Sequence, residues 1–180
     1  MVHSVELLFD AETESAVRRL WDDLTDAGVR SLASSTSPTN RPHATPAVAE
    51  QMDDAVNDAL RPLLEALPLA CTLGAPMLFG RGPFTLVRLV IPSVQLLALQ
   101  AEVHAVCLPY MSPGALPHAD PGHWTPHVTL SRRVPQDRLT DALSLRRMSR
   151  DQRATAVALR HWDGNKRVEY PITYGRYTKE

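Results

Sequence analysis

Two copies of one short pattern carry the residues best suited to chemistry in this chain. Pro42-His43-Ala44-Thr45 and Pro126-His127-Val128-Thr129 both read Pro-His-x-Thr, and their histidines lie 84 residues apart in a chain of 180. Each copy enters a segment that we predict to be a strand. A pattern repeated at nearly half the chain length indicates an internal duplication, with one motif in each half.

The spacing inside each motif favours a shared face. Side chains at positions i and i+2 of a strand point to the same side, so His43 projects with Thr45 and His127 with Thr129. If the two halves pack about a pseudo-two-fold axis, two imidazoles and two hydroxyls meet in one cleft. Imidazoles with a pKa of about 6.5 can serve as base and acid at once, and hydroxyls can donate hydrogen bonds to phosphoryl oxygens. The set suits displacement at phosphorus without a metal ion.

The paired motifs, the second continuing as His127-Val128-Thr129-Leu130-Ser131-Arg132, resemble those of the two-histidine (2H) phosphoesterase superfamily. The branch they resemble is the bacterial 2'-5' RNA ligase / RNA 2',3'-cyclic phosphodiesterase family. The resemblance covers the whole chain and implies an α+β fold. Residues 1–180 would form a single bilobal domain of two antiparallel sheets around a central cleft, with helices outside and one motif from each half. It also implies that His43 and His127 are catalytic and that Thr45, Thr129 and Arg132 bind the substrate.

The activity implied by this resemblance is opening of a 2',3'-cyclic phosphate, or cleavage or ligation of a 2'-5' phosphodiester. The partner would be an RNA end or a small nucleotide that carries such a phosphate, and neither a cofactor nor a metal would be needed. We expect a cytoplasmic monomer without membrane contact. An alternative from another class is a non-catalytic or slow nucleotide- or RNA-binding module that uses the same cleft.

Two departures from the family pattern affect the site. Pro46 stands where the family has an apolar strand residue, and proline cannot donate to a sheet ladder. The strand that begins at His43 is therefore expected to be short, distorted or at an edge. On the second strand, strict alternation puts Arg133 rather than Arg132 on the face of His127, unless a bulge or strand end intervenes.

Several other residues compete for a role. His123-Trp124-Thr125 also reads His-x-Thr but lies in a predicted loop, so its alternation is unreliable. His118, Asp120, His123 and His127 fall within ten residues and could bind zinc, although their intervals match no standard closed site. Trp124 and Tyr110 could stack on a base or pack the loop against the domain. Three other histidines are expected to be structural: His3, His104 and His161.

Composition narrows the class of protein. Hydrophobic residues make up 44% and charged residues 22%, and the formal net charge is -1. These values are typical of a globular domain and exclude disorder and overall electrostatic coating of nucleic acid. No apolar stretch reaches the roughly 18 residues of a membrane span, no secretion signal is recognisable, and Cys71 and Cys107 cannot form a disulfide framework. The candidate basic residues around the cleft are scattered, which favours small nucleotides over long RNA: Arg30, Arg41, Arg81, Arg88, Arg132 and Arg133.

The predicted elements alternate between strands and helices. Asp10 is a suitable N-cap for a first helix, in which Val17, Leu20, Trp21 and Leu24 form an apolar stripe. We predict strands over 2–9, 43–50, 69–73, 77–79, 84–90, 127–134, 153–162 and 167–173. We predict helices over 10–28, 53–67, 93–107 and 136–145, with loops over 31–42 and 109–126. This order indicates an α+β chain with largely antiparallel pairing.

Overall fold

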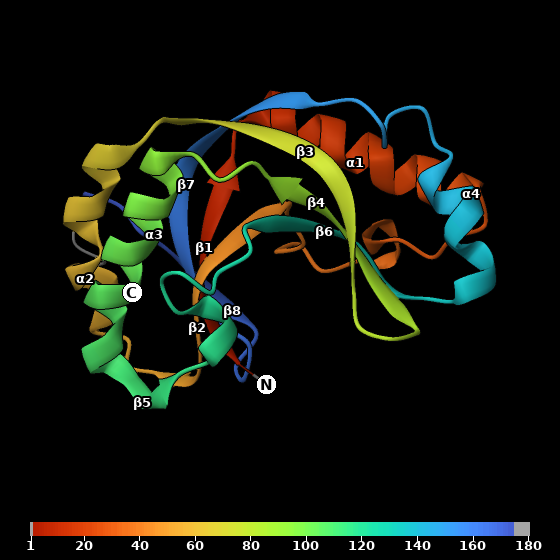
Figure 1. The fold of residues 1–180 in the computed structure, drawn as a ribbon. Coiled ribbons are helices and arrows are strands. Elements are labelled where there is room, and N and C mark those ends of the chain that lie inside the picture. Colours follow the sequence, from red (N-terminus) through yellow and green to blue (C-terminus); the bar gives the residue numbers. More distant parts are fainter. Residues whose placement is uncertain (1, 175–180) are drawn as a thin grey trace.

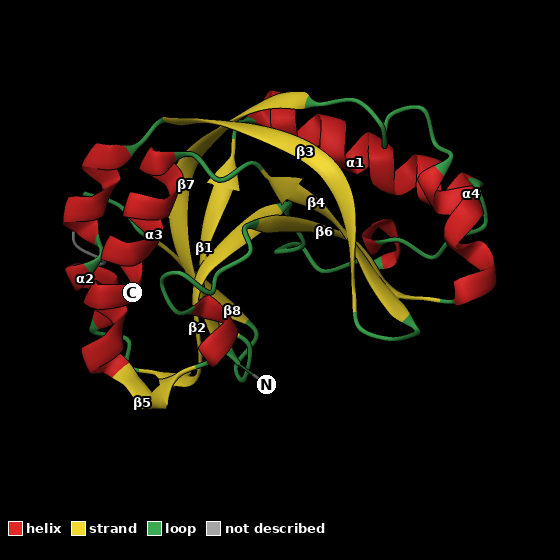
Figure 2. Cartoon of the chain, viewed as in Figure 1, coloured by secondary structure: helices red, strands yellow, loops and turns green. Residues whose placement is uncertain are grey.

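Within residues 2–174, eight antiparallel strands form the framework that carries both motifs (Figures 1 and 2). We describe residues 2–174 of a computed structural model. The strand order is β5-β2-β1-β7-β3-β4-β6, and β8 also pairs with β7. The strands are β1 (His3–Phe9), β2 (His43–Met52), β3 (Leu69–Phe79), β4 (Phe84–Val90), β5 (Met111–Ala115), β6 (His127–Val134), β7 (Gln152–Asp163) and β8 (Val168–Pro171). The helices are α1 (Ala11–Asp26), α2 (Val56–Ala59), α3 (Val94–Cys107) and α4 (Leu139–Leu143).

The sheet has two parts that one long strand joins. We call β1, β2, β5, β7 and β8 the first lobe, and β3, β4 and β6 the second lobe. β3 pairs with β7 over residues 69–73 and with β4 over residues 73–79. The predicted α+β class and antiparallel pairing are confirmed. The prediction of two separate sheets is wrong, because β3 is long enough to belong to both and makes one curved sheet of them.

The curvature of the sheet brings the two motif strands together. β2 and β6 do not share a ladder, yet they lie in contact, because the edge strand β6 bends back toward β2 (Figure 1). His43 pairs with Leu8 of β1, and His127 pairs with Leu89 of β4. The units β1-α1-β2 and β4-α3-β6 therefore place their motif histidines at matching positions, each at the first residue of its strand.

Each motif strand is fixed by a hydrogen bond from a helix. α1 begins after Asp10, whose carboxylate accepts from the Thr13 amide, and it buries its predicted apolar stripe against β6 and β7. Its Trp21 indole donates to the Thr129 carbonyl at 3.3 Å. α3 packs on β2, where the Gln100 side chain donates to the Pro46 carbonyl at 3.1 Å. These contacts hold the backbone of both motifs in place from outside the sheet.

Three element predictions are wrong for local reasons. The helix predicted over 53–67 is one turn, α2, followed by a 3-10 helix (Arg61–Ala66), because Pro62 lacks the amide that an α-helix requires there. The two short strands predicted over 69–73 and 77–79 are one strand, β3, with a register shift between Leu73 and Pro76. The loop predicted over 109–126 contains β5, which pairs with β2.

Residues expected to be structural lie apart from the motifs. The buried rings of His3 and His161 contact each other through Nδ1 and Nε2 at 3.0 Å, and His104 pairs with Asp120. Burial raises the pKa of the Cys107 thiol to about 12, so this cysteine is an apolar filler of the core. Within residues 2–174, every helix is too short or too polar to cross a bilayer.

Candidate active site

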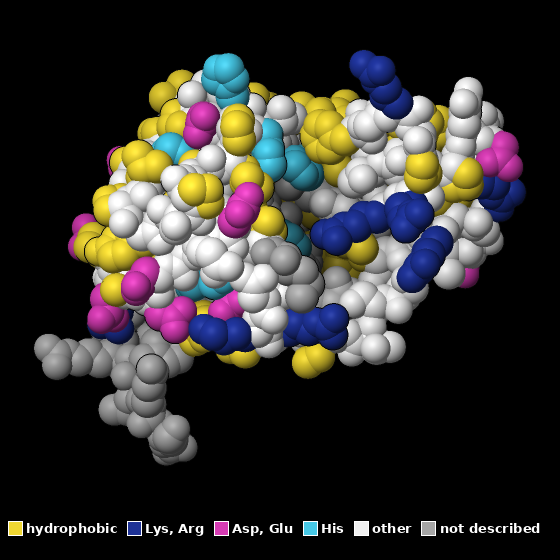
Figure 3. Space-filling model, turned by 90° about the horizontal axis from the view of Figure 1, so that it is seen from below, with side chains coloured by type: hydrophobic (Ala, Val, Ile, Leu, Met, Phe, Trp, Pro, Cys, Tyr) yellow, Lys and Arg dark blue, Asp and Glu magenta, His cyan; other side chains and the backbone are white. Residues whose placement is uncertain are grey.

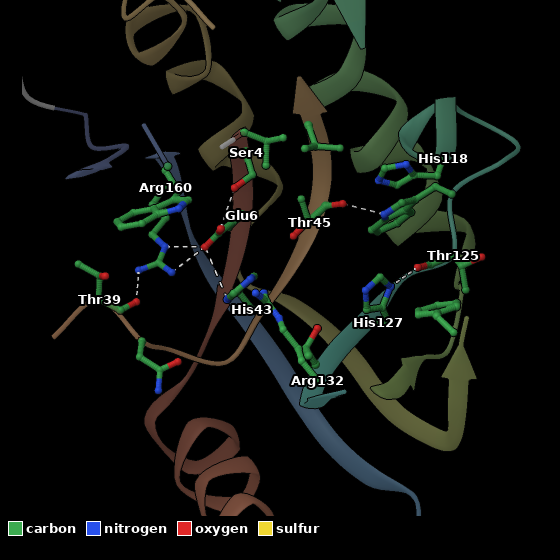
Figure 4. A pocket seen from close by; sticks show the side chains of 18 of the residues that line it. Ser4, Glu6, Thr39, His43, Thr45, His118, Thr125, His127, Arg132 and Arg160 are labelled. Atoms are coloured by element: carbon green, nitrogen blue, oxygen red, sulfur yellow. Dashed lines mark hydrogen bonds and ion pairs between the residues drawn. The ribbon is translucent and has the colours of Figure 1, made fainter. Parts of the chain in front are cut away.

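The two motifs open onto one pocket between the lobes. Its volume is about 900 Å³, and its lining includes all five residues predicted from the motifs: His43, Thr45, His127, Thr129 and Arg132. Figure 3 shows the hollow from below with histidine side chains at its wall. Figure 4 shows that His43 and His127 enter it from different strands. The structure thus brings the predicted residues together from positions 84 apart in the sequence.

Both motif histidines are oriented in the same way. The Nδ1 atom of His43 lies 2.7 Å from the Arg41 carbonyl, and that of His127 lies 2.7 Å from the Thr125 carbonyl. A carbonyl can only accept, so Nδ1 carries a proton in both rings. The remaining nitrogen, Nε2, is then the one that exchanges a proton with a ligand in the pocket. A backbone contact two residues upstream thereby fixes the tautomer at both positions.

The two imidazoles differ in their surroundings. Burial disfavours the charged form of His127 and holds its pKa below the ordinary value, although the hydrogen bond to the Thr125 carbonyl opposes this shift. A proton on His43 or on His118 would lower the pKa of His127 further. The Phe79 ring meets His127 edge to face, with the ring centroids 4.9 Å apart. His127 is therefore mainly neutral at pH 7.

A bulge resolves the difficulty that Pro46 presents. The three residue steps of β2 from Ala44 to Ala47 lie opposite only two residue steps of β1, so β2 has one extra residue there. Pro46 lies in this bulge, where no ladder hydrogen bond requires its missing amide. The strand continues for ten residues, so of the three predicted alternatives the distorted strand, rather than the short one, is the one observed. Thr45 still lines the pocket beside His43.

The threonine hydroxyls are available to a ligand. The Thr45 and Thr129 carbonyls accept from the indoles of Trp124, at 2.8 Å, and Trp21. Within residues 2–174, neither the Thr45 hydroxyl nor the Thr129 hydroxyl makes a hydrogen bond to another protein group. Both backbones are therefore held while both hydroxyls stay free to donate.

A second bulge decides between Arg132 and Arg133. β6 pairs Thr129 with Val87 but Ser131 with the adjacent Leu86, so one extra residue interrupts the alternation. Leu130 and Ser131 are both buried, and the side chain of Arg132 then returns to the face of His127 and lines the pocket. Arg133 follows with a left-handed backbone, φ 62°, and is exposed outside the pocket lining.

Three exposed arginines follow the rim of the second lobe. The Arg30 carbonyl accepts a hydrogen bond from Ser131, so Arg30 lies beside the bulge that precedes Arg132 and Arg133. Figure 3 shows Lys and Arg side chains on this side of the hollow and more numerous Asp and Glu side chains on the first lobe. Arg88 was a wrong candidate for the rim, since it is 2% exposed and bonds to backbone carbonyls.

The residues considered above for a zinc site do not form one group of metal ligands in the structure. His118 and His123 line the pocket, whereas Asp120 pairs with His104 at 3.2 Å. Within residues 2–174, no three His, Cys, Asp or Glu side chains are placed to hold one metal ion. The geometry therefore gives the metal interpretation of the 118–127 segment no support.

The two aromatic residues considered for stacking on a base, Trp124 and Tyr110, lie at different sites in the structure. Trp124 lines the pocket, packs partly against the core and donates its indole to β2, so it ties the loop to the first motif. Tyr110 packs on the core and borders a different, shallower depression. Stacking on a base stays a prediction for Trp124 alone.

The sequence interpretation missed a polar group on the first lobe. Glu6 of β1 and Arg160 of β7 line the pocket behind His43, with Ser4 beside them (Figure 4). The Glu6 carboxylate lies 3.6 Å from the His43 Nδ1 atom. A signal was present, because Ser4 and Glu6 are polar residues at i and i+2 in a strand whose other residues after His3 are apolar. Their partner Arg160 lies 154 residues away from Glu6 and could be matched only through the fold.

Comparisons with known proteins agree with this arrangement. Residues 10–166 match the model of a family described as the 2'-5' RNA ligase superfamily. Among solved structures, the chain is similar to Usb1 of Kluyveromyces marxianus, with a TM-score of 0.53 and 11% sequence identity. That match covers 95% of this chain and 97% of the other, and it concerns the fold alone. No curated protein sequence matches the chain.

Proposed function

This chain belongs to the 2'-5' RNA ligase superfamily, and on that basis we propose that it is a metal-independent phosphoesterase acting by two-histidine acid–base catalysis. Its substrates would carry a 2',3'-cyclic phosphate or a 2'-5' phosphodiester at an RNA end or in a small nucleotide. The observation that carries the proposal is the matching orientation of His43 and His127. Both rings are bound through Nδ1 to a carbonyl, at 2.7 Å, and both line one pocket.

The environments of the two rings suggest their roles in ring opening. His127, neutral because burial lowers its pKa, removes a proton from water as the water oxygen bonds to phosphorus. The bond from phosphorus to one ribose oxygen breaks, and His43 gives that oxygen the proton on its Nε2 atom. One water is consumed and a phosphomonoester is released. The two histidines have then exchanged protonation states, and proton exchange with solvent restores them.

The remaining motif residues would bind the phosphoryl group. The hydroxyls of Thr45 and Thr129 can donate to its two non-bridging oxygens, where charge increases in the transition state. Arg132 reaches the same pocket from the bulged part of β6 and supplies a positive charge. None of these roles requires a proton transfer, so each of the three would stabilise charge rather than act as acid or base.

The size and rim of the pocket suit the end of an RNA strand. A volume of about 900 Å³ lies in the range of small-molecule sites, roughly 300–1,000 Å³. Arg30 and Arg133 lie outside the lining, on the rim that leads away from Arg132. Those two charges could attract phosphates of neighbouring nucleotides, a contribution that weakens with salt. A mononucleotide would occupy the pocket without reaching them.

A panel of three substrates in excess chelator tests the proposal. It contains 2',3'-cyclic mononucleotides, an oligoribonucleotide ending in a cyclic phosphate, and a 2'-5'-linked dinucleotide. We expect turnover of the cyclic phosphates, with the oligonucleotide losing more of its kcat/KM than the mononucleotide as salt rises. The products, identified by chromatography, also show which P–O bond is broken.

Two results would count against the proposal. Turnover that disappears with chelator and returns with a divalent cation would contradict the metal-independent mechanism. Tight binding of nucleotides without turnover, unchanged in a His43→Ala variant, would favour the binding module instead.

A further inference from the structure

A cluster of buried charges lies behind His43 and is absent from the scheme given so far. Glu6 and Arg160 are each 3% exposed, and the Arg160 Nε and Nη2 atoms both contact the Glu6 Oε2 atom at 2.7 Å. The Arg160 Nη1 atom contacts the Glu169 carboxylate of β8 at 2.5 Å. Ser4 donates its hydroxyl to the other Glu6 oxygen at 2.8 Å. Residues of β1, β7 and β8 thus surround one carboxylate next to the first motif. Figure 4 shows Ser4, Glu6 and Arg160 beside His43.

The charges in this cluster do not balance. Two carboxylates, Glu6 and Glu169, share one guanidinium, that of Arg160. The cluster therefore has one more negative than positive charge, and Glu6 is the member that faces the pocket beside His43. Because Glu6 is buried, its field is screened by solvent and salt far less than that of a surface carboxylate.

The position of Glu6 relative to the ring is consistent with an electrostatic role. Its Oε2 atom lies 3.6 Å from the His43 Nδ1 atom, beyond normal hydrogen-bond distance, while the Arg41 carbonyl takes that proton at 2.7 Å. The ring is therefore oriented by the backbone, and the carboxylate contributes charge. The reactive Nε2 atom stays free to meet the substrate.

The other charged groups around His43 do not cancel the negative charge that Glu6 places beside its ring. Arg160 on β7 is shared with Glu169, and Arg41, which precedes the strand, directs its guanidinium to Glu14 at 2.9 Å. On β6, His127 is neutral and Arg132 is exposed to solvent at the pocket. The titratable groups that act on His127 are the imidazoles of His43 and His118, which lower its pKa when they are protonated. A carboxylate thus lies beside the His43 ring, whereas other imidazoles lie near the His127 ring.

We infer that Glu6 is a positioning residue for proton donation: its buried carboxylate, 3.6 Å from the His43 ring, favours the imidazolium form that donation requires, so that His43 acts as the acid and His127 as the base. This inference rests on the proposed function of the cleft and gives a structural cause for the direction of proton transfer stated there. Arg160 then has a second role, because it limits the charge that Glu6 presents to His43. The lobe that carries Glu6 is the one from which the leaving oxygen is protonated.

The test compares Glu6→Gln with Ser4→Ala. The first variant removes the charge of Glu6 and keeps its shape, whereas the second removes a hydrogen bond to Glu6 and keeps its charge. The pH dependence of kcat/KM gives the kinetic readout, and the 15N shifts of the imidazole nitrogens of His43 and His127 give a readout that needs no substrate. Far-UV circular dichroism and a urea titration establish that both variants are folded.

We expect Glu6→Gln to move the alkaline limb of the profile to lower pH by about one unit and to leave the acidic limb in place. The imidazolium fraction of His43 at pH 7 falls in this variant, while Ser4→Ala leaves both readouts unchanged. A uniform loss of rate at every pH, with unaltered ring shifts, would overturn the inference and make Glu6 a structural residue.

The experiments distinguish failure of the inference about Glu6 from failure of the proposed function. If the wild-type protein turns over none of the substrates, the proposed function fails, and the ring shifts still decide whether Glu6 keeps His43 protonated. Should Glu6→Gln fail to fold, the wild-type shifts at about pH 7.5, where an ordinary imidazole is mostly neutral, decide instead. The inference then requires an imidazolium at His43 and a neutral ring at His127, and the reverse assignment overturns it.

Discussion

Replacing either His43 or His127 by alanine is expected to lower kcat/KM for a 2',3'-cyclic phosphate by about 10²- to 10⁴-fold, the range for one acid–base participant. Each ring lines the pocket and has its Nδ1 atom occupied by a carbonyl, so no neighbouring group can take over at Nε2 without rearrangement. The loss should appear mainly in kcat, because the hydroxyls of Thr45 and Thr129 still bind the phosphoryl group. Initial rates with saturating and limiting substrate separate the two parameters.

The chain offers a matched control for these variants. His123 also precedes a threonine by two residues and lines the same pocket, but it lies in the segment before β6 rather than on a motif strand. We expect His123→Ala to stay within about threefold of wild type. The double variant of His43 and His127 should be little worse than either single one, because groups that act as a unit are not additive. A His127→Ala protein that keeps a tenth of the activity would contradict the scheme.

The Arg88→Met substitution is expected to reduce the free energy of unfolding by about 3–5 kcal/mol. The Arg88 guanidinium is buried and donates to four backbone carbonyls, those of Leu73, Gly74, Arg147 and Arg150, at 2.5–3.0 Å. Methionine fills the space but donates nothing, so the carbonyls at the point where β3 passes from β7 to β4 lose their partners. A domain of this kind is stable by only about 5–15 kcal/mol.

Urea titration followed by circular dichroism measures this loss. Arg81→Met in the exposed turn between β3 and β4 is the control, and its stability should stay within about 0.5 kcal/mol of wild type. If Arg88→Met costs less than about 1 kcal/mol, the carbonyls find other partners and Arg88 does not stabilise the connection between the lobes.

The features of this site that could be predicted from the sequence are those set by residues close together within each motif and by the repeat of the motif. His43 and Thr45, like His127 and Thr129, are two residues apart, so strand geometry alone indicated that each pair shares a face. The repeat at 84 residues indicated that the two pairs meet. Trp21, in the predicted apolar stripe of α1, was expected to be buried, and its hydrogen bond to β6 could not be read from periodicity.

The features that were missed depend on pairing between distant strands. Glu6 meets Arg160 only because β1 and β7 are neighbours in the sheet. Arg88, assigned to the rim, is buried because β4 carries it under the bend of β3. Bulges also have no simple sequence signature. Pro46 suggested a disturbed strand, but nothing local indicated that a bulge would accommodate it and keep Thr45 in the pocket.

The helix predicted over 53–67 shows a different limit. Val56, Leu60 and Leu64 have helical spacing and are buried, so the pattern itself was sound. Pro62 lacks an amide and cannot continue an α-helix, so the same apolar residues pack as one α-turn followed by a 3-10 helix. Burial was predictable there, whereas the backbone conformation was not.

The most direct test of the central claim is the pH dependence of kcat/KM for a 2',3'-cyclic mononucleotide, measured in excess chelator. Two imidazoles in opposite protonation states require a bell-shaped profile. Because burial lowers the pKa of His127, the acidic limb should lie below the ordinary histidine value of about 6.5. A flat profile between about pH 5 and 9, with turnover intact, would contradict acid–base catalysis by His43 and His127.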